Sequence, residues 1–262
     1  MRIVPARNGW LWLVRGFALF RKSPSMWLLL VLAYWIAMAL LSEIPYLGRL
    51  VSIVLLPAFS VGFMVMCAAL DRGEALRPVH LLFGFHGNTS TLMLLGVLYL
   101  LSIGAVLAVA SIADGGTLLR SILTGNEPPA EAIHDGSLPQ AMRLAAITAI
   151  PVTMAFWFAP MLAAWNRMGA AQALFYSFFA GWRNWRAFLV YSAALGLVGI
   201  AFLMLFAAAV IATRGEVELL NVLATVFMLL SLPSVLASVY ASYRDIFPEN
   251  RVPKIGLEGS PA

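Results

Sequence analysis

The chain alternates between long apolar stretches and short polar connections. Six stretches are apolar over about 20 residues, the length that a helix needs to cross the hydrocarbon core of a bilayer. They cover Met26–Ser42, Leu50–Leu70, Thr91–Ala113, Ala141–Trp165, Ala187–Thr213 and Leu219–Ser242. Apolar and polar residues do not alternate with a period of two, which argues against a β-barrel. The pattern predicts an all-α fold, a polytopic bundle of six transmembrane helices.

A shorter aromatic stretch, too polar to cross a membrane, precedes the first, third and fifth spans. The three stretches are Gly9–Lys22, Val79–Phe85 and Ala171–Arg186. In the first, apolar residues recur at helical spacing, and Arg15 and Lys22 share another face of the same helix. Such amphipathic segments are typical of helices that lie in the membrane interface. We therefore expect three interfacial helices, of which the middle one has the weakest pattern.

Proline marks the second, fourth and sixth spans, at Pro57, Pro151 and Pro233. Since proline removes a backbone donor and bends a helix, we expect kinks there. Neighbouring helices must then cover the freed carbonyls, so the even-numbered spans should pack centrally or line a cavity.

Together the stretches and prolines suggest a faint threefold repeat of interfacial helix, straight span and kinked span, unless the regularity is coincidence. The units would cover about 7–72, 76–167 and 168–247 of a single membrane domain, 1–248. We expect a disordered tail at 249–262, because that segment is rich in proline and glycine. The acidic connection between the third and fourth spans, 114–140, is expected to be a solvated loop.

The basic residues are distributed unevenly across the predicted spans. Thirteen of the 17 Lys and Arg residues fall on the side that carries both termini, and four fall on the other side. Acidic residues divide the opposite way, which leaves net charges of +8 and −3. Because cytoplasmic loops are enriched in Lys and Arg, we expect both termini in the cytoplasm.

Composition excludes several classes of protein. Hydrophobic residues make up 62% of the chain and charged residues 11%, and the mean hydropathy is +0.89. A soluble enzyme, a disordered chain and a disulfide scaffold are excluded by these values. The net charge of +5 does not indicate nucleic-acid binding, because the basic residues flank membrane spans.

Sites for chemistry are not apparent in the sequence. The spans carry no Asp, Glu, Lys or Arg near mid-depth, which argues against a coupled transporter. No phosphate-binding or dinucleotide motif occurs, and the His and Cys residues lack metal-ligand spacing, so we expect no catalytic residue, cofactor or metal. An enzyme would have to use polar residues near the inner face, namely Asp71, Glu74, Arg77, His80 and His86.

The candidate functional residues lie at the predicted inner interface. They are the basic and aromatic side chains that suit a lipid headgroup or a partner protein: Arg15, Lys22, Arg183, Trp185, Arg186, Tyr243 and Arg244. The alternative is that these residues only anchor the helices at the interface. Small residues also stack on two spans, as Ser234, Ser238 and Ser242 and as Ala58 and Gly62, and are expected to let helices approach closely.

Three motifs resemble a family of uncharacterised integral membrane proteins of betaproteobacteria. The first is G-W-x-W…G-F-x-L-F…P-x-x-W, here within Gly9–Trp27. The others are Arg183-Asn184-Trp185 and the closing Tyr-x-Ser-Tyr-Arg-Asp-Ile-Phe, Tyr240–Phe247. More remotely, the layout is similar to the six-span membrane domain that accompanies some glycerophosphodiester phosphodiesterases, without their catalytic domain. The resemblance implies a bacterial inner (cytoplasmic) membrane location and no established function.

The sequence leaves two functions in view besides the enzyme. The first is a non-catalytic inner-membrane scaffold, assembly factor or accessory subunit, whose partners would be membrane lipids and another integral membrane protein. The second is a lipid-handling protein or small-solute transporter that uses a cavity between proline-kinked helices. An opening beside Pro57, Pro151 and Pro233 would favour the second, and a closed bundle interior would remove its basis.

Overall fold

The computed structural model describes residues 1–45, 47–213 and 216–249. It is all-α, with 82% helix and no strand in the described part. The helices are α1 (Asn8–Arg21), α2 (Pro24–Ser42), α3 (Gly48–Asp71), η1 (Pro78–His80), η2 (Phe83–Phe85), α4 (Thr89–Asp114), α5 (Thr117–Thr124), α6 (Ala130–His134), α7 (Ser137–Trp157), α8 (Ala159–Trp165), α9 (Ala170–Arg183), α10 (Trp185–Ala212) and α11 (Val217–Ile246).

Six helical segments in the described residues are long and apolar enough to cross a membrane. They are α2, α3, α4, the pair α7 and α8, α10 and α11, and their bounds differ from the predicted spans by at most four residues. The prediction of an all-α bundle with six such helices is therefore confirmed. The expected disordered tail falls on residues 250–262 almost entirely, outside the described residues.

Two expected segments have a different local structure. The stretch Val79–Phe85 forms the two short 3-10 helices η1 and η2 in place of one continuous α-helix. The stretch follows Pro78 and ends before Gly87, whose positive φ is incompatible with a right-handed helix. The connection 114–140 contains the short helices α5 and α6, because Gly116, Gly125 and Gly136 adopt positive φ and terminate or start helical turns there.

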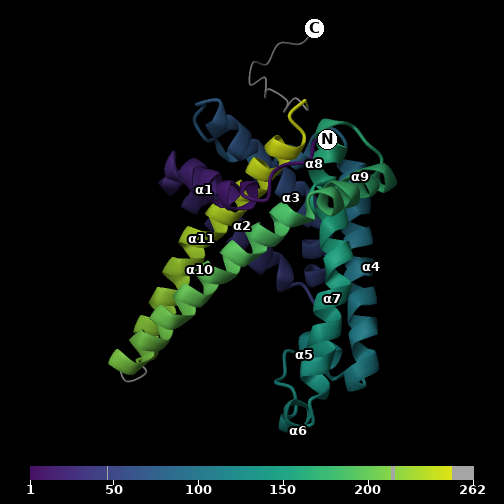
Figure 1. Ribbon diagram of the computed structural model, residues 1–262, viewed down its shortest axis with the longest axis vertical. Coiled ribbons are helices and arrows are strands. Elements are labelled where there is room, and N and C mark those ends of the chain that lie inside the picture. The colour runs from purple at the N-terminus through teal and green to yellow at the C-terminus, as the bar shows by residue number, and fades with distance from the viewer. Residues whose placement is uncertain (46, 214–215, 250–262) are drawn as a thin grey trace.

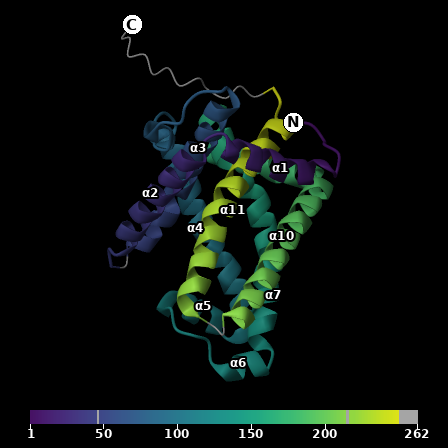
Figure 2. The ribbon, with the colours of Figure 1, turned by 90° about the vertical axis from the view of Figure 1, so that its left-hand side faces the viewer.

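The long helices meet at one end of the molecule and diverge toward the other (Figure 1). We call the first the packed end; it comprises α1, α8, α9 and the adjoining ends of α3, α10 and α11. The opposite end, called the open end, carries α5, α6 and the tips of α10 and α11. In the view of Figure 2, α2 also diverges from the hairpin of α10 and α11 with distance from the packed end.

The core lies at the packed end. In α10 the buried residues are Ala187, Tyr191 and Ala194, all within its first ten positions. In α11 burial begins at Pro233 and continues to Ile246. Side chains therefore pack against one another at the packed end, whereas the halves of α10 and α11 toward the open end have little contact with the rest of the protein.

Only one of the proline-containing spans is central. Of the most apolar stretch of α3, 72% is buried, against 22% for α7 with α8 and 17% for α11. α3 packs against α2, α4, α8 and α11. Of the two arrangements expected for the proline-containing spans, the central position applies to α3, whereas α7 and α11 form the edges of diverging hairpins and line cavities.

Small residues bring backbones into contact, as the sequence predicts. A Cβ on Gly16 of α1 would lie 2.4 Å from the carbonyl oxygen of Ser234, and one on Gly9 would lie 2.1 Å from that of Ala187. α1 therefore crosses α10 and α11 at these two glycines. Similarly, η2 meets α3 where Gly84 faces Ala58.

Candidate headgroup site at the packed end

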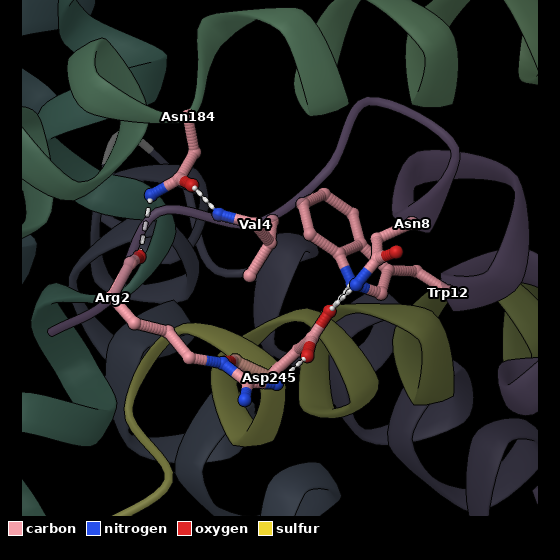
Figure 3. Close-up of polar contacts among 6 residues, drawn as sticks. All are labelled: Arg2, Val4, Asn8, Trp12, Asn184 and Asp245. Carbon is pink, nitrogen blue, oxygen red and sulfur yellow. Dashed lines mark hydrogen bonds and ion pairs between the residues drawn. The ribbon is translucent and has the colours of Figure 1, made fainter.

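α1 is fixed in place by a buried carboxylate near the end of α11. Asp245 accepts hydrogen bonds from Asn8 Nδ2 at 2.7 Å and from Trp12 Nε1 at 2.9 Å, and it pairs with the guanidinium of Arg2 (Figure 3). Its side chain is 3% exposed. A buried carboxylate is stable only when its oxygens are satisfied in this way, so the N-terminal segment and α11 are held together.

A second polar side chain holds the segment before α1. Asn184, between α9 and α10, accepts from the Val4 amide at 2.8 Å and donates to the carbonyl oxygen of Arg2 at 3.2 Å (Figure 3). The Arg2 amide in turn donates to the Ile246 carbonyl at 2.9 Å. These contacts connect the N-terminal segment to three helices at once.

The contacts explain the sequence motifs. Gly9 and Gly16 permit the close approach of α1, Trp12 donates to Asp245, and Asn184 is the middle residue of the Arg-Asn-Trp motif. The motif residues are therefore docking residues of α1. Their consequence for function is that α1 presents its remaining faces in fixed directions.

One of these faces lines a basic cavity of about 340 Å³ between α1, the end of α3 and the end of α11. Three cationic side chains surround it: Arg15 and Lys22 from α1, and Arg244 from α11. One carboxylate, Asp71, lies with them, so the cavity carries a net charge of +2. Three of the seven predicted site residues are thus brought to one place.

Hydrogen bonds order the rim of the basic cavity. Tyr240 donates its hydroxyl to Asp71 Oδ2 at 3.1 Å, and Lys22 Nζ donates to the Leu70 carbonyl at 2.8 Å. Across residues 1–45, 47–213 and 216–249, the ion pairs are Arg2 with Asp245 and Arg72 with Glu74. Arg15, Lys22 and Arg244 therefore keep their charge available for an anion, and phosphate is the anion that arginine suits best.

The other predicted residues lie elsewhere at the packed end. Arg183 ends α9, and Trp185 and Arg186 begin α10, where the Arg186 guanidinium lies 5.6 Å from the Trp185 ring centroid. Tyr243 is fully buried, and its hydroxyl donates to Asn166 Oδ1 at 3.2 Å. Tyr243 is therefore a packing residue that cannot contact a headgroup at the surface.

The prolines lie inside their helices, and α7 ends at a different place. Pro57, Pro151 and Pro233 each lie within a continuous helix. The helical conformation is instead interrupted at Phe158, between the end of α7 and the start of α8, two residues before Pro160. Ser177 of α9 accepts from the Phe158 amide at 2.9 Å and donates to the Met154 carbonyl at 2.8 Å, so it satisfies the groups freed by the break.

Two smaller cavities flank this region of α7. One of about 230 Å³ is lined by Pro57, Pro160, Tyr99 and Phe156, and another of about 220 Å³ lies between α7 and α10 beside Ile150. Thr153 and Trp157 line both. The lipid-handling or transporter alternative calls for an opening beside Pro57, Pro151 and Pro233. Pro57 lines one of these cavities, and Ile150, the neighbour of Pro151, lines the other.

The polar residues considered for an enzyme do not gather into one pocket. Glu74 pairs with Arg72, Asp71 faces the basic cavity, and the Nδ1 of His80 accepts from the Arg77 amide at 3.3 Å. Burial lowers the pKa of His80, so this imidazole favours the neutral form. In the described part of the chain, no group of three His, Cys, Asp or Glu residues could hold a metal ion.

Sequence reasoning missed the residues that position the site. Asn8, Trp12 and Asn184 are ordinary interfacial residues by pattern, and only the fold brings them to the end of α11. The presence of Asp71 and Tyr240 in the basic cavity was likewise unforeseen. A signal existed in the spacing of Gly9, Trp12 and Gly16, which puts all three on one face of a helix.

With this geometry in view, the comparisons with known proteins are informative about location. The chain is 37% identical over 213 residues to a probable inner membrane protein of Burkholderia thailandensis, an alignment that covers 77% of this chain and 79% of the relative. The chain belongs to the family of that protein. It is therefore an inner membrane protein with membrane-spanning helices.

Neither of the other two comparisons adds a function. No family model matches the chain, and no solved structure is significantly similar to it. The relative's name says nothing of glycerophosphodiester phosphodiesterases, so that remoter resemblance remains without support.

Proposed function

We propose that this inner membrane protein binds anionic phospholipid headgroups in its basic cavity and is a lipid-handling protein without catalytic activity. The observation that carries the proposal is the convergence of Arg15, Lys22 and Arg244 around one cavity with a single carboxylate. Each of the three is exposed at the packed end, where a headgroup phosphate has access. Cationic side chains at the membrane surface attract anionic lipid at roughly 1 kcal/mol each.

The proposal places the packed end in the cytoplasm. The thirteen Lys and Arg residues on the side of the termini support that orientation, because cytoplasmic connections carry the excess of basic residues. A reporter enzyme that works only in the cytoplasm, fused after residue 262, should therefore be active. Activity on the periplasmic side would contradict the orientation and the inner-leaflet lipid with it.

The headgroup site is tested by thermal unfolding of the purified protein in mild detergent, with phosphatidylglycerol or phosphatidylcholine added. Phosphatidylglycerol should raise the midpoint of wild type more than phosphatidylcholine, because a ligand that binds the folded state stabilises it. The variant Arg15→Gln/Lys22→Gln/Arg244→Gln should lose this difference. Adding about 0.5 M salt should reduce it in wild type, since ions screen exposed charges.

A matched control uses basic residues remote from the cavity. Arg120→Gln/Arg143→Gln removes two exposed arginines, one in α5 and one in the first turns of α7 near the open end, and should keep the wild-type response. A second control, Arg183→Gln/Arg186→Gln, asks whether the predicted residues outside the cavity also bind lipid. An unchanged preference for phosphatidylglycerol in the triple variant would refute the headgroup site.

A second candidate function is the scaffold or accessory subunit, and the exposure of α10 favours it. Only 6% of its most apolar stretch is buried, so a helix of another membrane protein has room to pack there. Crosslinking in native membranes followed by mass spectrometry should then capture one recurrent partner. A protein that is recovered only as a monomer with lipid would count against the scaffold and leave the lipid-handling function.

A further inference from the structure

α1 has a second flank that faces away from the basic cavity. Trp10, Leu13, Val14 and Phe17 of this flank line a groove of about 450 Å³ together with parts of α10 and α11. The α10 and α11 residues are Leu195, Val198, Phe227, Leu230, Ser231, Ser234 and Val235. The groove is larger than the basic cavity, and apart from two serines its lining is apolar.

The groove is open although its walls are hydrophobic. Trp10 is 53% exposed, Phe17 50% and Leu230 48%, so large apolar side chains stand around an unfilled space. The Ser234 hydroxyl donates to the Leu230 carbonyl at 3.0 Å, so its hydrogen does not need an acceptor on a bound ligand. Such a space suits an apolar ligand; for scale, a dry apolar cavity of ~150 Å³ holds one benzene ring.

The depth of the groove matches an acyl chain. Its α11 wall runs from Val235 to Phe227, eight residues or about 12 Å along the helix axis. Phe227 stacks on Phe202 of α10 with ring centroids 3.8 Å apart, and this pair closes the far end between the two helices. A space that reaches ~12 Å below an interfacial helix lies within the hydrocarbon core, which is ~30 Å thick.

A cation marks the end of this flank. Arg21 follows Phe17 by one helical turn, and its guanidinium lies 5.9 Å from the centroid of the Phe17 ring. The side chain is exposed, so it can meet a phosphate at the interface while Phe17 contacts the chain below it. The apolar groove and the cation are therefore arranged as the two parts of a phospholipid are arranged.

From this juxtaposition we propose that the groove between α1, α10 and α11 holds one acyl chain of an inner-leaflet phospholipid whose phosphate contacts Arg21. This site is separate from the basic cavity, since the two lie on different flanks of α1 and share no residue.

Native mass spectrometry of the full chain, extracted from membranes in mild detergent, tests the groove. On the Arg15→Gln/Lys22→Gln/Arg244→Gln background, which removes the lipid site of the basic cavity, the chain should retain one phospholipid. Leu230→Trp fills the groove and should lower the retained fraction about tenfold, equivalent to about 1.4 kcal/mol. The matched control Leu203→Trp makes the same change on α10 outside the groove, at a residue 63% exposed, and should retain the lipid.

A second variant keeps the test decisive if Leu230→Trp unfolds. Arg21→Gln changes an exposed side chain only, so it should lower retention of phosphatidylglycerol without unfolding the chain. The triple variant of the basic cavity should still retain the groove lipid, so failure of one site is distinguishable from failure of the other.

The outcomes against the proposal are equally specific. Equal retention by Leu230→Trp and Leu203→Trp, or a wild-type chain that carries no phospholipid, overturns it. A dimer that Leu230→Trp dissociates would assign the groove to a second copy of the chain and overturn the lipid as occupant.

Discussion

The packed end and the open end are built from the same long apolar helices, yet only one of them has a core. In α11 every fully buried residue lies between Pro233 and Ile246, and none lies in the first half of the helix. Hydrophobicity does not explain why only one half of α11 is buried. In a membrane, an apolar side chain is as stable against lipid as against another apolar side chain. The contacts of Gly9 and Gly16 and the buried hydrogen bonds of Asp245 lie at the packed end, and contacts of these kinds hold α1, α10 and α11 together.

The largest effect is expected from Asp245→Ala. This change removes the acceptor of Asn8 and Trp12 and leaves Arg2 without its partner, which should destabilise the fold by about 3 kcal/mol. Thermal unfolding in detergent measures it. Glu218→Ala, an exposed acid at the other end of α11, is the control and should change the midpoint little. Equal effects would mean that the packed end has no special stability.

A smaller loss is expected from Gly16→Val. The new Cβ would meet backbone atoms of Ser234 and Ser238 at 2.4 and 2.6 Å, so α1 has to lift from α11 at a cost of about 2 kcal/mol. Gly196→Val is the matched control, because nothing lies within 4 Å of a Cβ at Gly196 on α10. If both variants unfold at the same temperature, the close contact at Gly16 does not stabilise the packed end.

The smallest effect concerns pH. Burial lowers the pKa of His80 below its ordinary value of 6.5, so the unfolded chain takes up this proton before the folded chain does. The contribution to stability is complete above pH 6.5 and declines as the pH falls below that value. His80→Asn should flatten the melting temperature between pH 7.5 and 5.5, and His86→Asn, at an exposed site, should not. A slope unaffected by His80→Asn would contradict this origin.

The spans were predictable from sequence, and the way they meet was not. A run of about 20 apolar residues is a strong signal because the bilayer dictates its length. The break at Phe158 was missed, since it depends on Ser177 from another helix. The central position of α3 was likewise hidden, because α7 and α11 carry the same internal proline as α3.

Part of the candidate site, the pairing of Arg15 with Lys22, could be predicted from sequence, and the contribution of α11 could not. Arg15 and Lys22 share a face of one helix, so the periodicity indicates them together. Arg244 joins them from more than 200 residues away, and Tyr243 beside it turns inward to Asn166. Which of two adjacent residues faces the cavity is decided by packing, and a single sequence does not contain that information.

The crossing of α1 over α11 also has a consequence for biosynthesis. α1 leaves the ribosome before α11, the helix that carries Asp245. Until α11 is made, α1 has no helix to dock on and lies in the membrane interface, where its apolar face contacts the acyl chains. The N-terminal segment can therefore dock only after α11 has been synthesised, so a chain without α11 would leave α1 undocked.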